Sequence, residues 1–492
     1  MTEQVVHVRV NDAGTGRPTP VRLRFATPEG RYLAPLGRLA EFPTAPRQDV
    51  GGHLQLGDQR YAYIDGTCEI RLPAGPLAVE ISKGPEYTPI RQTIVRRHGQ
   101  IALRFSLERR FDPQAEGWYA GDTQVFLLGP AAAWLEGAAE GLHIVNVLAA
   151  EWREPGRRVL TNILDFSGQE PALARDGCLV AVNTQNRHDT LGWLTLLNCH
   201  RIVHPLALPQ EGFEAWTLFD WCGQCHRKGG LVVWPAFPDR RGELVADLIL
   251  GGIDAVEWTE PGSFFSVGLP EWYRWLDCGF RVPIVGGSGK ASNTIPVGLV
   301  RTYAQLDPGQ ELTYARWIEA VRRGRTFATR GPLVRFTVNG QGPGASLPLP
   351  ETTAEFSIQA AARSVVPFEE LEVVANGAVL ARASAGPDLT ATLTLTQPYH
   401  ARGPSAPVWL AARCVGAGGL LAHTSPVYLR PAQPAADPQS AEPFLTHLIQ
   451  LSQWAETHVS AATAREHLHV ILTNAQTALR QRLAPPRLQS GT

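Results

Sequence analysis

The stretch GWYAGDTQVFLLGP, residues 117–130, is typical of a strand that runs into a turn. The segment that follows, PAAAWLEGAAEG at residues 130–141, predicts a short helix that ends at Gly141. The apolar run HIVNVLAA at residues 143–150 then predicts a second strand. Near-continuous apolar runs are what strands buried on both faces require, as in parallel sheets. We therefore expect a strand–helix–strand unit at this point of the chain.

The same alternation continues to about residue 330. Further apolar runs are GCLVAVNTQ, GGLVVWPAF, DAVEWTE and RVPIVGGSG. Between them, ELVADLILGG predicts a helix that ends at Gly251, and LTYARWIEAVRRG predicts an amphipathic helix with Gly324 as its C-cap. This order favours a βα barrel or a doubly wound sheet, which we place at residues 111–332.

The regions on either side have strand patterns. Residues 1–110 contain short alternating runs such as VVHVRV and VRLRF, separated by Gly and Pro turns, which predicts an N-terminal β-sandwich. Residues 333–430 predict a second β-sandwich, with a hairpin whose type I′ turn is Asn376–Gly377. We thus expect a multidomain chain of α/β and all-β parts.

The C-terminal region is predicted to be helical. Residues 431–443, rich in Pro and Ala, indicate a linker, and residues 444–492 a helical tail. Thr463 and Glu466 have the spacing of a capping box, and residues 484–492 are predicted to be disordered. We expect the tail to dock on the body of the protein, with an oligomer contact as the alternative. The stripe that would dock contains Leu468, Leu472, Ala475 and Leu479.

Composition excludes several classes of function. The net charge of -1 gives no bulk attraction to nucleic acid or to anionic membranes, so we expect neither as a partner. No apolar run reaches about 18 residues, the length that a membrane-spanning helix needs. The opening MTEQVVHVRVND has no secretory pattern, and seven scattered cysteines favour a reducing compartment. We expect a cytoplasmic protein, and the oligomeric state is not predicted.

Several segments in a fixed order resemble a known family. They are EGWYAGDTQV, HRKGGLVVWP, WYRWLDCGFRVPIVGGSGK, VGLVRTY and RRGRTFATRGPLVRFTVNG, and they resemble the CehA/McbA family of metallohydrolase-like proteins in the polymerase and histidinol phosphatase (PHP) superfamily. The segment YIDGTCEIRLPAGPLAVEISKGPEYTP looks like the β-domain that precedes the barrel in such proteins. The resemblance covers roughly residues 1–430. It implies a distorted, TIM-related βα barrel with metal ions at the strand ends and hydrolysis of phosphoesters or esters.

The metal ligands that the resemblance implies are replaced in this chain. The first strand should read Gly-Asp-x-His-x-His, but the two His positions hold Gln124 and Phe126. Residues 149–152 hold no Asp-His pair, Trp234 stands where a His is implied, and Lys290 follows Gly-Ser-Gly where a carboxylate is implied. Phe cannot ligate a metal, a neutral Gln oxygen replaces imidazole poorly, and Lys adds charge of the wrong sign. We therefore expect no metal ligands and no cofactor, although a divalent metal is the family expectation.

Polar residues at the strand ends are the candidates for a site at the barrel mouth, where barrels bind their ligands. The catalytic candidates are Asp122, Gln124, His188 and Glu257. The ligand-binding candidates are Asn186, Arg187, Ser288, Lys290 and Arg301. The ligand that these residues favour is a small anion.

Simpler alternatives stand beside each candidate. The segment GGSGKASN, residues 286–293, is an anion cradle or a plain tight turn. NTQNRHDTLGW, residues 183–193, is a mouth segment with a His188–Asp189 proton-transfer pair or a solvated loop. Asp122 is a catalytic group, or an acceptor for backbone N–H groups of the turn that follows. Arg301 is a second cation or a surface strand charge.

A cluster of cysteines raises two further hypotheses. Cys222, Cys225 and His226 match the C-x-x-C-H pattern of haem attachment, and the alternative is a helix whose cysteines pack inward. The same residues have the ligand types of a zinc site. The additional ligands of such a site would come from Cys199, His200 or His204.

Three functions remain open at this stage, so the sequence leaves undecided whether the chain is an enzyme. The first is a pseudoenzyme, a metal-free relative of PHP hydrolases that keeps the barrel as a binding or scaffold module. The second is an active hydrolase of phosphoesters or esters with a rebuilt site at the barrel mouth. The third is an adhesion or assembly protein in which the β-sandwiches bind the partner.

Overall fold

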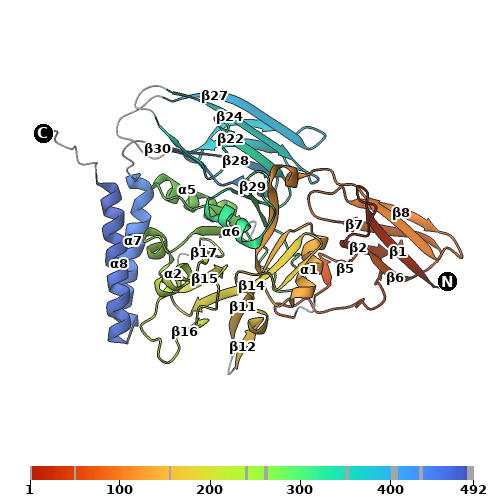
Figure 1. Cartoon of the computed structure of the whole chain (residues 1–492), viewed down its shortest axis with the longest axis horizontal. Helices are drawn as coiled ribbons and strands as arrows, with labels where there is room; N and C mark the ends of the chain where they lie inside the picture. The colour runs from red at the N-terminus through yellow and green to blue at the C-terminus, as the bar shows by residue number, and fades with distance from the viewer. Residues whose placement is uncertain are drawn as a thin grey trace.

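The computed structural model of the chain describes residues 3–484 except for seven short segments: 49–50, 155–156, 239–241, 260–263, 350–353, 400–407 and 431–435. The chain is a mixed α/β protein in which strands predominate. The N-terminal strands lie at one end of the molecule and a pair of long C-terminal helices lies at the other (Figure 1).

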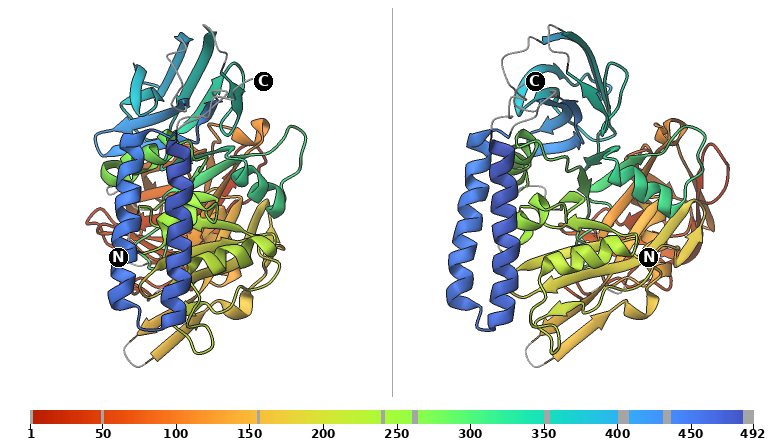
Figure 2. Two further views of the ribbon diagram at one scale, coloured as in Figure 1. Left: turned by 90° about the vertical axis from the view of Figure 1, so that its left-hand side faces the viewer. Right: turned by 60° about the vertical axis from the view of Figure 1, so that its left-hand side comes forward.

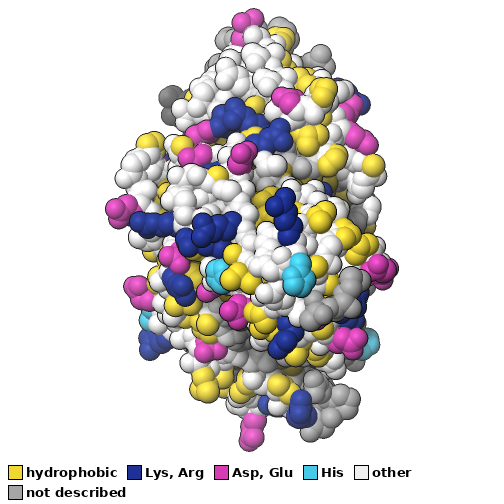
Figure 3. Space-filling view, turned by 90° about the vertical axis from the view of Figure 1, so that its right-hand side faces the viewer, with side chains coloured by type: hydrophobic (Ala, Val, Ile, Leu, Met, Phe, Trp, Pro, Cys, Tyr) yellow, Lys and Arg dark blue, Asp and Glu magenta, His cyan; other side chains and the backbone are white. Residues whose placement is uncertain are grey.

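The N-terminal region consists of two sheets that share one hydrophobic core. Its smaller sheet has the strand order β6 (Thr67–Leu72), β1 (Gln4–Asp12), β9 (Ala102–Leu107). Its larger sheet has the order β4 (His53–Leu56), β5 (Gln59–Ile64), β2 (Val21–Ala26), β7 (Gly75–Ser82), β8 (Ile90–Arg96), with β3 (Tyr32–Leu33) beside β2. Alternate residues of strands in both sheets, such as Val6, Val8 and Val10 of β1, are fully buried between them. Basic and acidic side chains are interspersed over the outer face of this end (Figure 3).

The central sheet is built around parallel strands. β10 pairs with β11 and β11 with β14 in parallel, and β17, β18 and β19 are likewise parallel to one another. The antiparallel strand β15 joins the two groups. The bounds of these strands are β10 (Trp118–Val125), β11 (Ile144–Glu154), β14 (Cys178–His188), β15 (Gly192–Leu197), β17 (Leu231–Trp234), β18 (Ala255–Trp258) and β19 (Ile284–Gly286).

The sheet returns towards its first strand. Phe126, directly after β10, donates its N–H to the carbonyl of Lys290, which follows β19, at 2.9 Å. On its other side β10 is antiparallel to β20, and β20 to β21. The remaining strands of the region are β12 (Arg157–Thr161), β13 (Leu173–Arg175), β16 (Ala207–Leu208), β20 (Arg301–Gln305) and β21 (Thr326–Thr329).

Helices connect these strands where the sequence predicts them. Gly141, at φ 72°, follows the last turn of α1, and Gly324, at φ 70°, follows the end of α6, so both predicted ends are confirmed. Thr313 begins α6 by accepting a hydrogen bond from the N–H of Arg316. The helices of the region are α1 (Pro130–Ala139), α2 (Leu218–Arg227), α3 (Leu244–Ile249), α5 (Leu269–Asp277) and α6 (Tyr314–Arg322).

The C-terminal strands are continuous with the central sheet, because β21 pairs with β29 and places Phe327 opposite Thr424. The expected boundary at residue 333 is therefore crossed by a strand ladder. The Asn376–Gly377 turn is confirmed, with positive φ at both residues. The sheet β22 (Leu333–Val338), β24 (Ala354–Arg363), β27 (Thr390–Tyr399) packs on the others: β23 (Ser346–Pro348), β25 (Glu370–Ala375), β26 (Ala378–Ser384), β28 (Val408–Gly416), β29 (Gly419–Thr424) and β30 (Val427–Arg430).

The tail is a pair of helices, α7 (Pro438–His458) and α8 (Ala462–Leu483), that run side by side along one side of the molecule (Figure 2). The predicted stripe is buried in a core shared with α3 and α5, so docking on the body is confirmed. Two details differ from expectation. The helix α7 begins inside the expected linker, and α8 begins at Ala462 without a side-chain cap, so the predicted capping box at Thr463 is wrong.

Two further expectations concern the ends and the membrane. Residues 485–492, most of the segment expected to be disordered, lie outside the described residues. Among the helices that the structure describes, none combines the length and the apolar character that a membrane crossing requires.

Candidate functional site

A cavity of about 370 Å³ lies where the central strands end. Because β10, β11 and β14 are parallel, their C-terminal residues meet at one rim of the sheet, and the residues that follow β17, β18 and β19 complete it. Its lining consists of two arginines, four aromatic side chains and several small or amide residues: Arg47, Arg187, Phe126, Trp152, Trp193, Phe237, Gln124, Gln185, Ala236, Thr259 and Gly289.

The two arginines stack on the two tryptophans of the rim. The guanidinium carbon of Arg47 lies 4.4 Å from the ring centre of Trp152, and that of Arg187 lies 4.9 Å from the ring centre of Trp193. Stacking holds a planar guanidinium by its face and leaves its N–H edge directed sideways, which suits bidentate binding of a carboxylate or phosphate. Among the described residues that line the cavity, no side chain is acidic. The rim is therefore electropositive.

Two positions that the resemblance assigns to metal ligands form part of the cavity wall. Gln124 is 6% exposed at the end of β10, and the ring of Phe126 packs edge-on against Trp152 with 5.3 Å between ring centres. Trp234, in the position of a third implied ligand, is fully buried and packs on Phe237. The donors at this rim are amides and guanidinium groups rather than imidazoles and carboxylates, so the implied divalent metal does not fit these residues.

Asp122 lies beneath the rim and accepts hydrogen bonds from backbone N–H groups. Its carboxylate accepts hydrogen bonds from the N–H groups of Gln124 and Ser288, both at 2.9 Å, and of Gly298 at 2.7 Å. Burial raises the pKa of Asp122, while the backbone donors oppose that rise. Since both oxygens are engaged by backbone groups, the contacts of Asp122 favour the structural reading over the catalytic one.

Glu257 is a buried acid in contact with the cavity lining. It accepts hydrogen bonds from the hydroxyls of Thr123 and of Thr259, the latter at 3.0 Å, and Thr259 itself lines the cavity. Burial raises the pKa of Glu257 to about 7. Gly287 permits this arrangement, because a Cβ atom at that position would lie 2.5 Å from Glu257 Oε1.

Lys290 does not line the cavity, and its ammonium bonds to groups inside the fold. Its ammonium lies 3.2 Å from a carboxylate oxygen of Glu136 on α1 and donates to the carbonyls of Ser292 and Ile295. Ser288 is likewise used internally, since its N–H bonds to Asp122 and its hydroxyl accepts the N–H of Lys290. The contacts of Ser288 and Lys290 are those of a tight turn whose polar side chains bond within the fold.

Arg301 is also internal. Its guanidinium donates to the carbonyl of Gly298 at 2.9 Å and to that of Glu140 at 2.7 Å, and the residue is only 5% exposed. It therefore ties the end of α1 to the loop before β20. Neither a ligand-binding cation nor a surface charge describes it.

Two of the candidate site residues in β14 form hydrogen bonds to the protein's own backbone. The amide of Asn186 donates to the carbonyls of Val203 and Pro205, at 2.8 and 2.9 Å. His188 Nδ1 accepts backbone N–H groups of the following turn, and burial lowers the pKa of His188 to about 4. Asp189 pairs with Arg153 instead of His188, so the two residues do not form a proton-transfer pair. Arg187, between them in sequence, is the residue of this stretch that reaches the cavity.

The cysteine cluster does not assemble the ligand set of a metal or haem site. Cys222 and Cys225 are buried on α2, as the simpler alternative predicts. His226 lies 2.9 Å from Asp254, and His200 bonds to the carbonyl of Lys228. Within the ranges that the structure describes, no group of three or more His, Cys, Asp or Glu side chains is arranged to hold a metal ion.

The sequence pointed to Gln124 and Arg187 but missed their partners. Arg47 belongs to a loop between β3 and β4, far away along the chain, and Trp193 is the second residue of the antiparallel strand β15. No local pattern marks either residue as part of a rim. One feature of the sequence could have identified an aromatic residue of the rim. Trp152 stands among residues 149–152, where the resemblance implies an Asp-His pair of metal ligands.

Comparisons with known proteins assign the chain to no family. No protein-family model matches it, and no curated protein matches it significantly.

Proposed function

We propose that the chain is a metal-free relative of the CehA/McbA and PHP hydrolases, a pseudoenzyme that binds a small organic anion at the rim of its central strands. The observation that carries this proposal is the pair of Arg–Trp stacks at the strand ends, where the resemblance implies metal ions. The parallel strands, and the pairing of the segment after β19 with β10, support a closed and distorted βα barrel as the frame.

The physical argument for an anion rests on charge and size. The guanidinium of Arg187 faces a cavity whose described lining holds no carboxylate. A bound carboxylate or phosphate would pair with Arg187 through charge-assisted hydrogen bonds. The cavity volume of about 370 Å³ matches a small organic molecule, and the four aromatic side chains favour a ligand with an apolar or aromatic part.

Calorimetric titration tests the proposal. The probes are benzoate and phenyl phosphate, with benzamide as a neutral analogue of similar shape. We expect at least one of the anions to bind more tightly than benzamide, and Arg187→Gln to weaken that binding by about tenfold or more, because a desolvated charge pair is lost. Arg104→Gln, an exposed arginine of β9, is the matched control and retains the affinity. Equal binding of benzamide, no binding of either anion, or unchanged affinity in Arg187→Gln contradicts the proposal.

A second candidate function is an active hydrolase, and Glu257 is the observation that favours it. This carboxyl, with a pKa of about 7, is separated from the cavity by the hydroxyl of Thr259. It has the acidity that general acid–base catalysis requires near neutral pH. Turnover of 4-nitrophenyl esters or phosphates that Glu257→Gln abolishes while anion binding remains would favour this candidate over the pseudoenzyme.

A further inference from the structure

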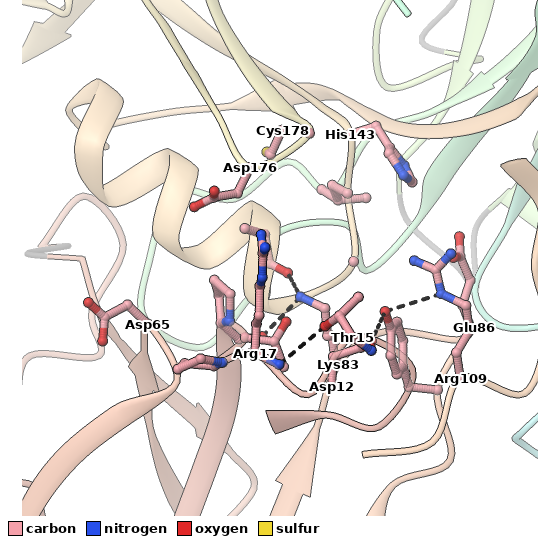
Figure 4. Close-up of a pocket in the computed structure, with 18 of the residues that line it drawn as sticks. Asp12, Thr15, Arg17, Asp65, Lys83, Glu86, Arg109, His143, Asp176 and Cys178 are labelled. Atoms are coloured by element: carbon pink, nitrogen blue, oxygen red, sulfur yellow. Dashed lines mark hydrogen bonds between the residues drawn. The ribbon is translucent and has the colours of Figure 1, made fainter. Parts of the chain in front are cut away.

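A second and larger cavity, of about 790 Å³, lies between the N-terminal sheets and the opposite ends of the central strands (Figure 4). His143 immediately precedes β11, and Cys178 begins β14, so this cavity faces the starts of the strands whose ends form the rim. The last turn of α1 and the segment after β7 complete it. The two cavities are separate sites at the two ends of one sheet.

The amino group of Lys83 is the central polar feature of this cavity. It donates to the carbonyl of Ala138, in the last turn of α1, at 2.6 Å and to that of Pro20 at 3.0 Å. The residue is only 9% exposed, and no carboxylate of the described chain lies within ion-pairing distance of it. Burial lowers the pKa of Lys83 to about 8, so the group carries its charge at neutral pH.

The acidic side chains around the cavity are committed elsewhere. Asp12 accepts the N–H of Thr15 at 2.8 Å and the hydroxyl of Tyr87 at 2.9 Å. Glu86 accepts the hydroxyl of Tyr303 at 2.9 Å and the amide of Gln114. Asp176 pairs with Arg175 at 3.2 Å, and Asp65 is exposed at the edge. None of these carboxylates lies within ion-pairing distance of Lys83, and Asp12 and Glu86 attract its ammonium from farther away.

Arginines and a histidine also line the cavity, whose cationic side chains equal its carboxylates in number. Arg17 also lines the cavity, and both Arg109, at 5.2 Å, and the Lys83 ammonium, at 5.8 Å, lie over the ring of Tyr87. His143 lines the same cavity, and its buried Nδ1 has no hydrogen-bond partner in the described chain. Burial and the nearby cations lower the pKa of His143 to about 3, so the imidazole is neutral. The cavity thus contains a buried ammonium with two carbonyl acceptors, and a buried ring nitrogen whose hydrogen bond is unmade.

We propose that this cavity is a second ligand site, which binds a small molecule through a carboxylate or phosphate group paired with the Lys83 ammonium. A buried charge is ordinarily paired, and two neutral carbonyls satisfy two of the three N–H groups of the ammonium without neutralising it. An oxyanion accepts the third N–H and supplies the counter-charge. The site is independent of the proposed rim site, since Lys83 contributes nothing to the rim.

The composition of the chain makes the test direct. Lys83, Lys228 and Lys290 are its only lysines, so reaction with an amine reagent is resolved by mass spectrometry at three side chains. The probes are inorganic phosphate and citrate at constant ionic strength, which separate phosphate from carboxylate binding. At ten times the dissociation constant we expect about tenfold slower labelling of Lys83, with Lys228 unchanged.

Thermal unfolding provides a second readout that does not depend on reagent access. We expect phosphate or citrate to raise the melting temperature of the wild type and of Arg187→Gln, in which the rim site is weakened, but not of Lys83→Met in the same Arg187→Gln background. Lys83→Arg keeps the charge and retains part of the response, which covers the case in which Lys83→Met fails to fold. A role limited to capping α1 predicts instead a lower melting temperature for Lys83→Met with an unchanged response to the anions. That result overturns the proposal, as does a wild type that neither anion stabilises.

Discussion

Glu257 accepts a hydrogen bond of 3.0 Å from the hydroxyl of Thr259, and Thr259 forms part of the wall of the rim cavity. A buried acid is thereby connected to a solvent-facing site through one hydroxyl. Because burial raises the pKa of Glu257 from 4.5 to about 7, its protonation state changes near neutral pH. Titration of Glu257 therefore affects both the stability of the protein and the hydrogen bonding of the cavity wall.

We predict that Glu257→Gln becomes more stable relative to the wild type as the pH rises. The unfolded wild type releases the proton of Glu257 near 4.5, whereas the folded protein holds it to about 7. Rising pH between these values therefore favours the unfolded state, by up to about 3 kcal/mol for this group, and Gln does not titrate. Urea unfolding at about pH 5 and about pH 8 measures the difference. Glu108→Gln, at an exposed site, is the control, and parallel curves for Glu257→Gln and wild type would refute the assignment.

Gly287→Ala tests the close approach that places Glu257 under the rim. A Cβ at this position would lie 2.5 Å from Glu257 Oε1 and 2.7 Å from Thr123 Oγ1. We expect a loss of about 1–3 kcal/mol of unfolding free energy, because the added methyl group overcrowds the strand ends and forces the backbone to shift. Gly129→Ala is the control, since its Cβ would meet no atom within 4 Å. Equal stability of the two variants would show that the strand ends have more room than the structure gives them.

Lys290→Met examines whether this lysine supports the fold rather than a ligand. Its ammonium and the carboxylate of Glu136 are both fully buried and lie 3.2 Å apart. Removing one member leaves a buried charge, so we expect a loss of about 3 kcal/mol of unfolding free energy and unchanged binding of anions at the rim. The double variant Lys290→Met/Glu136→Leu recovers part of the stability. Lost anion binding in a folded Lys290→Met protein would return Lys290 to the ligand-binding candidates.

Local patterns predicted the elements of the central sheet well, because their physical causes are local. The glycines after α1 and α6 end those helices through positive φ, and the apolar runs become strands buried on both faces. Sequence patterns failed where the partner of a side chain is set by residues that are near in space but far away in the sequence. Lys290 follows a strand that ends at the rim, as Arg187 ends another, yet it turns towards Glu136 on α1. Sequence spacing holds no information about that partner.

Long-range contacts set the remaining features. Arg47 reaches the rim from a loop of the N-terminal region, where its N–H bonds to the carbonyl of Ala291. The pairing of β21 with β29 crosses a boundary that the change of pattern at residue 333 suggested. The predicted capping box fails because Ala461 is the N-cap of α8, so Thr463 lies inside the first turn of the helix.

The docking of the C-terminal helices is tested by Leu472→Ala, with Val470→Ala as a control on the same helix. Leu472 is fully buried in the core that α8 shares with α3, α5 and α7, whereas Val470 is 51% exposed. We expect Leu472→Ala to lower the unfolding free energy by about 2–5 kcal/mol through the cavity that it leaves. Val470→Ala should stay within about 0.5 kcal/mol of the wild type. Urea unfolding followed by tryptophan fluorescence reports on the contact, because Trp275 of α5 stacks on Phe444 of α7 with 3.7 Å between ring centres. If the two variants are equally stable, the helices do not stabilise the body, and the stripe is then available for an oligomer contact.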